Sequence, residues 1–335
     1  MKKLFTFILV LALLVTTFSS CSLSKNDTVI RIGYMQGPTG MGIAKLIHDN
    51  GSVSGNEKYE FVKFEDAQKA TAALLSGSID LACLPTNTAA TLYNTKNGAV
   101  QALALNCLNS LYLMTKSGSE ITSFAELEGK TVYTIANGTP KILLEYLLNE
   151  LGVSATVKTT ATVNGNEKDL VQPSDLAQAM ITGSVDIALV PEPVATSAPL
   201  QIASQNKEYS YTVSLDLKNV WSQCSDTPIA MGCIVGNTEF IKNNKNAVNS
   251  FLNDYKSSIE FISNSANSEL AADYIVEAEV LGAAGPAKKS LKNLGDQIAY
   301  YDGTAMREIL SSFLAVLNPG VIGGKLPDEG FYYEK

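Results

Sequence analysis

The sequence predicts an α/β protein made of two similar lobes. One pattern occurs twice in the 335-residue chain: the end of a helix, a glycine, and a short apolar strand that ends in proline. The first copy runs from Ala73 to Pro85 and the second from Ala179 to Pro191, an offset of 106 residues. Recurrence of a whole helix–strand unit indicates a second lobe built like the first, with a cleft between them as the first place to look for function. The alternative is that a common unit recurs by chance.

Both copies predict the same local structure. Gly77 and Gly183 suit the left-handed position after a helix, where a residue with a Cβ atom would be strained. The apolar runs that follow are typical of strands buried on both faces, so each lobe is expected to be a mostly parallel sheet flanked by helices. Ligands of open α/β sheets bind beyond the carboxyl ends of the strands. The residues placed there are those that follow the two prolines: Thr86, Asn87, Glu192 and Pro193.

The first lobe is expected to open with a strand, a glycine-rich turn at 37–42 and a helix whose free N–H groups point toward the end of that strand. Its expected elements are strands at 29–35 and 59–64, helices at 41–49, 67–75 and 85–93, the strand of the repeat, and strands at 99–105 and 110–116. The last of these strands is expected to make the first crossing between the lobes.

The second lobe repeats this plan. Ser123 and Glu126 fit a capping box, and a strand at 131–135 and a helix at 141–151 follow. The turn at 136–140 is the counterpart of 37–40, because both place glycine or hydroxyl-bearing residues at a helix N-terminus that faces the same cleft. Such a helix end favours an acceptor or an anion on the ligand. The alternative is a pair of ordinary strand-to-helix turns.

The chain becomes rich in helix after residue 219. A strand at 228–235 is expected to make the second crossing, and the helices that follow would close around the first lobe. These helices are expected at 238–264, 268–281, 287–294 and 304–317. The domain boundaries that result are 28–112 and 222–335 for lobe I, and 113–221 for lobe II.

The N-terminal segment, residues 1–20, has the features of a secretory signal peptide. Lys2 and Lys3 precede an apolar run that is shorter than the roughly 20 residues needed to span a bilayer. The stretch Phe18-Ser-Ser-Cys21 resembles a bacterial lipobox, in which the cysteine becomes the lipidated first residue. Residues 21–27 would then tether the globular part to the outer face of the cytoplasmic membrane. The alternative is an ordinary Cys21 behind a simple secretory signal.

Charge and residue usage argue against several classes of function. The formal net charge of −8 becomes −10 without residues 1–20, which argues against nucleic acid or anionic membrane as the ligand. A single histidine, His48, and cysteines without a CxxC pair give no support for a metal site, a cofactor or nucleophilic catalysis. Cys83 and Cys107 are expected to be buried. Cys224 and Cys233 form the one close pair after Cys21, and the sequence leaves open whether they make a disulfide.

Several segments together resemble an ABC-transporter solute-binding lipoprotein. They are the lipobox-like leader, the Arg31-Ile-Gly-Tyr34 strand before Gly-Pro-Thr-Gly, the paired Gly-Ser-x-Asp strands, Glu192-Pro193, and Phe240-Ile-x-Asn-Asn-Lys-Asn-Ala-Val-x-x-Phe251-Leu. The resemblance extends from Met1 to about Ser265 and is strongest to the subgroup that binds nitrate, sulfonates, taurine or thiamine-pyrimidine precursors. It implies a type II periplasmic-binding-protein fold, in which two lobes joined by two crossing segments close over a small ligand and deliver it to a permease. An aromatic residue often precedes the acidic-Pro pair in that subgroup; here Val190-Pro191 stands there, so the stacking partner is unassigned.

The expected cleft has one wall from each lobe. The ligand-binding residues expected on lobe I are Pro38, Thr39, Gly40, Thr86, Asn87 and Asn106, and those on lobe II are Asn137, Gly138, Thr139 and Glu192. Two readings of Glu192 stay open: it points into the cleft toward a donor or positive charge on the ligand, or it caps a helix and the ligand is neutral or anionic. The candidates for stacking are Tyr34, Tyr112 and Trp221, each of which also suits a core position.

The expected function is capture of a small organic molecule and its delivery to an ABC permease and ATPase by a lipid-anchored, extracytoplasmic monomer. Two rival classes stay open. One is an enzyme on the same fold, similar to menaquinone-pathway dehydratases or pyrimidine-forming enzymes, which the leader and the shortage of histidine disfavour. The other is a surface sensor or adhesion lipoprotein whose partner is a protein.

Overall fold

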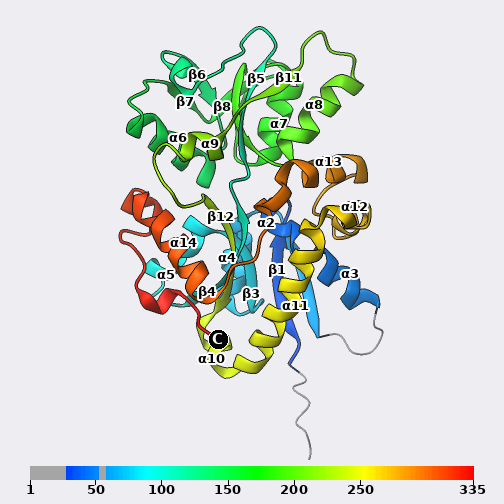
Figure 1. Cartoon of the computed structure of the whole chain (residues 1–335), viewed down its shortest axis with the longest axis vertical. Helices are drawn as coiled ribbons and strands as arrows, with labels where there is room; N and C mark the ends of the chain where they lie inside the picture. Colours follow the sequence, from blue (N-terminus) through cyan, green and yellow to red (C-terminus); the bar gives the residue numbers. More distant parts are fainter. Residues whose placement is uncertain (1–27, 53–57, 137) are drawn as a thin grey trace, which may run out of the picture.

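The computed structural model describes residues 28–52, 58–136 and 138–335, which form two five-stranded sheets, one in each of two stacked lobes, and a two-stranded hairpin (Figure 1). The expected signal peptide at 1–20, Cys21 with its tether to residue 27, and the expected site residue Asn137 lie outside the described residues. No helix in the described part is both long enough and apolar enough to cross a membrane.

The first sheet has the strand order β2-β1-β3-β12-β4. Strands β2, β1 and β3 run parallel to one another, whereas β12 runs antiparallel to both β3 and β4. The strands are β1 (Ile30–Met35), β2 (Tyr59–Phe64), β3 (Leu81–Pro85), β4 (Val100–Leu108) and β12 (Ala230–Asn237). The last strand therefore enters the sheet of the first lobe after the whole second lobe has been completed.

The second sheet repeats this arrangement in the order β7-β6-β10-β5-β11. Here β5 is the antiparallel strand, and it lies between β10 and β11. The strands are β5 (Leu111–Lys116), β6 (Thr131–Tyr133), β7 (Thr156–Lys158), β10 (Ile187–Pro191) and β11 (Tyr211–Asp216). The two strands of the sequence repeat, β3 and β10, occupy the central place in their sheets, and the predicted α/β class with two mixed, mostly parallel sheets is confirmed.

A left-handed glycine occurs in both repeats, and a partly buried ion pair supports the first one. Gly77 and Gly183 have φ angles of 72° and 70°, so both lie in the left-handed region that was predicted for them. In the first copy the Asp80 carboxylate, which is 4% exposed, accepts from the backbone N–H of Arg31 at 2.8 Å and from its guanidinium at 2.6 and 3.0 Å. This charge-assisted pair fixes β3 beside β1.

The chain passes between the sheets twice. It leaves the first sheet at Leu108 and enters the second at Leu111, and it returns between Trp221 and Ala230. Strand β5 lies wholly in the second sheet, so the expected boundary at 112/113 falls inside this strand. The expected second-crossing strand is β12, which pairs along its length with the first sheet.

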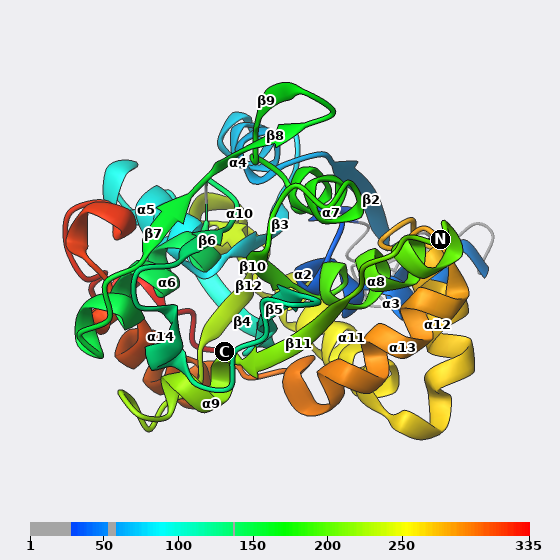
Figure 2. The same cartoon turned by 90° about the horizontal axis from the view of Figure 1, so that it is seen from above.

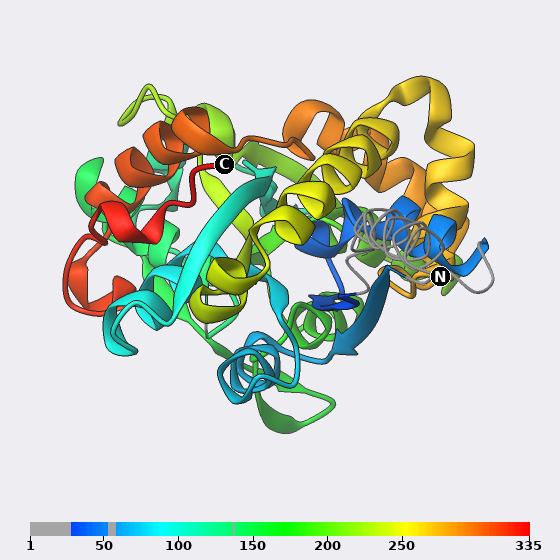
Figure 3. The ribbon, with the colours of Figure 1, turned by 90° about the horizontal axis from the view of Figure 1, so that it is seen from below.

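Helices cover both faces of each sheet (Figures 1 and 2). Those of the first lobe are α2 (Pro38–Met41), α3 (Ala44–Ser52), α4 (Ala67–Ser76), α5 (Thr86–Thr95), α10 (Thr238–Asn243), α11 (Lys245–Ser263), α12 (Ser268–Glu277), α13 (Ala284–Leu294) and α14 (Gly303–Val316). Those of the second lobe are α6 (Thr139–Glu150), α7 (Pro173–Ile181), α8 (Val194–Ser204) and α9 (Leu217–Trp221). Seen from below, α11 runs obliquely beside the first sheet, with α12 and α13 outside it (Figure 3).

Several details differ from the sequence expectations. The helical region at 238–264 is two helices, because the chain breaks at Asn244 between α10 and α11. The helix expected at 41–49 is likewise divided into α2 and α3. A hairpin of β8 (Thr160–Val163) and β9 (Asn166–Asp169) was not expected, since its second strand is polar and exposed throughout.

Two apolar clusters form the core. The larger one fills the first lobe and continues into the second along α6 and α9, where Trp221 packs against Phe313 and Tyr146. The smaller cluster lies between the second sheet and α7 and α8. All four cysteines of the described residues are free, so the structure has no Cys224–Cys233 disulfide. Cys83, Cys107 and Cys233 are buried as small apolar residues, and burial raises the pKa of Cys83 and Cys107 to about 12.

Candidate functional site

The candidate site lies where the ends of the two sheets face each other (Figure 1). Two helices begin there in each lobe: α2 follows β1 and α5 follows β3, while α6 follows β6 and α8 follows β10. The first N–H groups of a helix have no partner within it. The four helix starts therefore carry backbone donors to the region between the lobes.

A tight turn places Thr39 on the wall of the first lobe. Gly37, at φ 100°, precedes the short helix α2, and a Cβ atom on Gly40 would lie only 2.0 Å from the carbonyl oxygen of Met35. Asn106 of β4 then holds the turn, because its Nδ2 donates to the carbonyl oxygen of Thr39 at 3.2 Å and to the Tyr255 hydroxyl at 2.9 Å. Asn106 is wholly buried and joins the turn to β4 and α11.

The turn that contains Thr39 packs against Gly232 of β12, in the space that a side chain at position 232 would fill. A Cβ atom there would lie 2.4 Å from Cγ2 of Thr39 and 2.6 Å from Oδ1 of Asn106. Neither contact is compatible with the present packing. Gly232 is thus a residue of the site that the sequence analysis did not identify, since its role depends on two segments more than a hundred residues away in the chain.

The turn of the second lobe has the same backbone conformation. Gly138 has φ 100° and ψ −175°, and Gly37 has φ 100° and ψ −173°. Thr139, which begins α6, is buried and donates its hydroxyl to Oδ1 of Asn87 at 3.2 Å. Because Asn87 lies in the first turn of α5 in the first lobe, this bond directly joins two residues that were predicted on opposite walls. The lobes are in contact here, which is a closed arrangement.

Thr86 has a different place from its neighbour Asn87. Its side chain is wholly buried, and its hydroxyl donates to the backbone carbonyl of Ala230 in β12. That bond uses the hydroxyl proton to fix the start of α5 to the sheet. Pro38 and Thr39 are half-buried and Gly40 is buried.

Glu192 is wholly buried and its carboxylate accepts three side-chain hydrogen bonds. It accepts from the Thr196 hydroxyl at 2.8 Å. It also accepts from the Ser290 hydroxyl at 3.1 Å and from Nδ2 of Asn293 at 2.9 Å. Burial raises the pKa of Glu192, and the hydrogen bonds from Asn293, Thr196 and Ser290 oppose that rise. Helix α8 has no side-chain N-cap, and the Glu192 carboxylate instead bonds to Thr196 and to two residues of α13 in the first lobe.

The three stacking candidates are all less than 10% exposed. Trp221 belongs to the core, where its indole N–H donates to the carbonyl of Thr227. Tyr34 donates its hydroxyl to the carbonyl of Ala278 at 3.0 Å. Tyr112 lies between the lobes, and burial raises its pKa to about 12.

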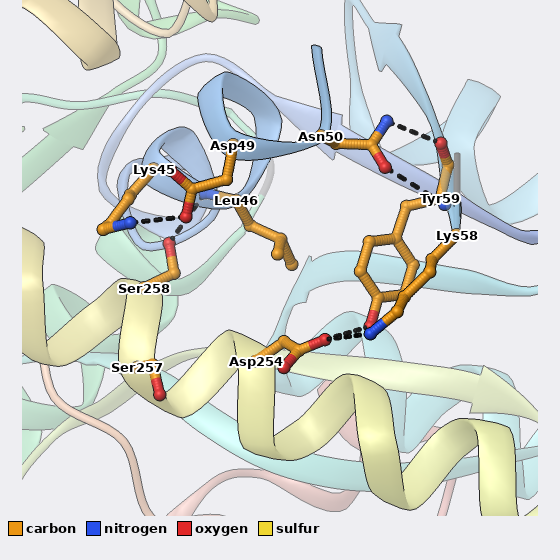
Figure 4. A pocket seen from close by; sticks show the side chains of 9 residues that line it. All are labelled: Lys45, Leu46, Asp49, Asn50, Lys58, Tyr59, Asp254, Ser257 and Ser258. Atoms are coloured by element: carbon orange, nitrogen blue, oxygen red, sulfur yellow. Dashed lines mark hydrogen bonds and ion pairs between the residues drawn. The ribbon is translucent and has the colours of Figure 1, made fainter. Parts of the chain in front are cut away.

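A separate hollow of about 320 Å³ lies outside the region between the lobes, among α3, the start of β2 and α11 (Figure 4). Its polar side chains already pair with one another: Lys45 with Asp49, and Asp254 with both Tyr59 and Lys58. Asn50 binds the backbone of Tyr59. These pairs leave no convergent set of groups for a ligand, and no group of metal-binding side chains occurs in the part of the chain that the structure describes.

Comparison with known proteins gives the family. The family model described as "NMT1/THI5 like" matches residues 58–267, which is more than half of the chain. The chain belongs to the NMT1/THI5-like family. No curated protein matches this family member.

Solved structures similar to this NMT1/THI5-like chain are ABC-transporter binding proteins, as the sequence resemblance implied. An ABC transporter structure from Parabacteroides distasonis has a TM-score of 0.71 at 22% identity, covering 92% of this chain and 99% of that one. The periplasmic aliphatic sulphonate binding protein SsuA of Escherichia coli has a TM-score of 0.68 at 16% identity, covering 91% and 92%. The periplasmic nitrate-binding protein NrtA of Synechocystis PCC 6803 has a TM-score of 0.61 at 16% identity, covering 86% and 80%. At these identities the similarity establishes the two-lobed fold.

The packing at Gly232 gives a test of the site in this NMT1/THI5-like protein. Gly232→Ala should lower the free energy of unfolding by about 1–3 kcal/mol, because the new methyl group overpacks the turn. It should also weaken ligand binding, since Thr39 must move. Thermal denaturation and isothermal titration with a compound found by screening measure the two effects.

Gly236→Ala is the matched control in the same strand. Its Cβ atom would lie 2.7 Å from Cδ2 of Leu81 and 2.9 Å from Cδ1 of Ile241, away from the site. It should cost similar stability and leave affinity unchanged. Equal losses of affinity in both variants would show that Thr39 is not part of the binding wall.

Proposed function

We propose that this protein is an extracytoplasmic solute-binding lipoprotein that captures a small organic molecule between its lobes and delivers it to an ABC-type importer. The observation that carries the proposal is the Thr139–Asn87 hydrogen bond, because it joins the starts of α6 and α5 from opposite lobes at 3.2 Å. Family membership and the two-lobed fold support it. The ABC permease and ATPase subunits are the proposed partners, and the protein acts as a monomer.

The mechanism that we propose is a two-state hinge. The hinge comprises the two places where the chain passes between the sheets, at 109–110 and at 222–229. Because β5 moves as part of the second sheet, lobe I consists of residues 28–110 and 222–335 and lobe II of residues 111–221. A ligand that contacts both walls favours the closed state by its differential affinity for the two states.

The cleft walls favour a ligand that is neutral or anionic. Thr39, Asn87 and Thr139 supply hydroxyl and amide groups, and the starts of α5 and α6 supply backbone N–H donors. The Glu192 carboxylate, in contrast, is already occupied by its three side-chain hydrogen bonds. A positively charged ligand would therefore find no free carboxylate at that position.

Binding rather than catalysis is the activity that we propose. The described polar side chains on the expected walls are hydroxyls and carboxamides, which bind and orient a molecule, and one carboxylate, Glu192, which is held by three side-chain hydrogen bonds. His48, the single histidine of the sequence, lies on α3 and contacts Glu277 at 2.7 Å. The buried thiols of Cys83 and Cys107 have raised pKa values, which disfavours the reactive thiolate.

A thermal-shift screen tests the proposed function. Sulfonates, pyrimidine and other vitamin precursors, and amino-acid-like compounds should include one that raises the melting temperature and binds saturably, since a ligand of the native state stabilises it by mass action. Thr139→Val should weaken binding of that compound about threefold to tenfold, because it removes the hydroxyl that bonds Asn87. Thr39→Trp should abolish binding by filling the cleft.

Thr162→Val, at an exposed position of hairpin strand β8, is the matched control and should bind like the wild type. Failure of every compound in a broad metabolite set to stabilise the protein would count against the transport proposal. Unchanged affinity in Thr39→Trp would show that the cleft lies elsewhere.

The proposed anchor depends on Cys21. Cys21→Ser should move the protein from the membrane fraction to the soluble extracytoplasmic fraction, because a lipidated cysteine provides the apolar attachment. Cell fractionation with immunodetection measures this distribution. A variant that stays with the membrane would refute the lipid anchor.

A further inference from the structure

One face of α13 and of the short 3-10 helix that follows it (Gly295–Gln297) is polar and points at the second lobe. Ser290, Asn293 and Gln297 follow one another at spacings of three and four residues, which places them on one side of a helix. Each of them donates a hydrogen bond to a side chain of the second lobe. The acceptors are Glu192, Thr196 and Tyr112.

The strongest of these contacts converge on Glu192. Ser290 donates its hydroxyl to Oε2 at 3.1 Å, and Asn293 donates Nδ2 to Oε1 at 2.9 Å. Asn293 Nδ2 also lies 2.8 Å from the Thr196 hydroxyl, which itself donates to the carboxylate. Hydrogen bonds to a buried carboxylate are worth more than those between neutral groups.

Two longer contacts extend this junction. Gln297 donates Nε2 to the Tyr112 hydroxyl at 3.3 Å, and Tyr112 donates to the backbone carbonyl of Asn293 at 3.4 Å. Tyr112 stands at the start of β5, directly after the first passage between the lobes. The polar face of α13 therefore reaches the second lobe on both α8 and β5.

The other face of α13 belongs to the first lobe. Ala287, Leu291 and Leu294 are buried in the larger apolar cluster, and α13 packs on α12, which in turn packs on α3 and α11. In the figures α13 stands between α12 and α8 (Figures 1 and 2). The same helix is thus fixed to one lobe by apolar packing and to the other by hydrogen bonds that water can replace.

We propose that Ser290 and Asn293 are positioning residues that act through Glu192 as a latch between the lobes and favour the closed state before any ligand is bound. The proposal deepens the proposed binding function, on which it rests for its biological purpose. When the lobes separate, Glu192 keeps the hydrogen bond from Thr196, which is on the same lobe. It loses the hydrogen bonds from Ser290 and Asn293, which are on the other lobe. Contacts that exist only in the closed state shift the equilibrium toward it. Binding of the ligand then has to provide less free energy to close the lobes.

A distance measurement on ligand-free protein tests the latch. Nitroxide labels at Lys207→Cys in the second lobe and Lys242→Cys in the first report the separation of the lobes, in full-length protein with Cys21→Ser and Cys224→Ser. Double electron–electron resonance should show that Ser290→Ala with Asn293→Ala lowers the ratio of closed to open molecules at least about tenfold, because the variant loses two hydrogen bonds to a charged group and the loss of one such bond corresponds to about tenfold. The melting temperature should change little.

Two further variants separate the latch from a merely structural role. Ser290→Thr keeps the hydroxyl and should preserve the wild-type distance distribution. Lys289→Ala, exposed on the same helix, should also leave the distribution unchanged. If the double variant does not fold, Asn293→Ala alone carries the test, with a smaller shift in the same direction.

Identical distance distributions in the wild type and the latch variants would overturn the proposal. The measurement needs no ligand, so its outcome is separate from that of the metabolite screen. A latch that opens as expected in a protein that binds nothing would refute the proposed function and leave the latch intact. A ligand that binds the wild type and the double variant equally tightly, with unchanged distances, would refute the latch and leave the proposed function intact.

Discussion

Polar side chains buried between two lobes must find their hydrogen-bond partners on the opposite lobe, and the closed arrangement of this protein depends on that constraint. Thr139 donates to Asn87 at 3.2 Å, and neither is more than 8% exposed. Glu192 is wholly buried and takes two of its donors from α13. A buried carboxylate or amide without a hydrogen-bond partner would lower the free energy of unfolding by more than its hydrogen bond contributes. The positions of these donors and acceptors therefore determine how the two lobes meet.

The sequence predicted the fold through its local patterns. The repeated helix–glycine–strand unit gave the two central strands and their left-handed glycines, since both depend on a few neighbouring residues. It did not predict the hairpin of β8 and β9, whose second strand carries no apolar alternation. Nor did it predict the break at Asn244, because the apolar spacing of the long helical region continues on both sides of that residue.

The residues of the candidate site that could be predicted from the sequence are those that lie at the ends of strands and the starts of helices. Asn87 and Thr139 were placed on opposite walls, and they meet; Thr39 and Asn106 were placed on one wall, and they are bonded. The partners of Glu192 were not predictable, because Ser290 and Asn293 are 98 and 101 residues further along the chain. The polar spacing of 290, 293 and 297 was visible on the predicted helix, but the sequence does not show which surface a helix of the C-terminal region will face.

In the proposed function, the two walls of the protein come together around a small molecule. A crystal structure with the compound that stabilises the protein tests this claim most directly. Electron density is expected between the starts of α2 and α5 on one side and the start of α6 on the other, within hydrogen-bond distance of Thr39 or Thr139. Density confined to the hollow among α3, β2 and α11, or to the outer surface of one lobe, would contradict it.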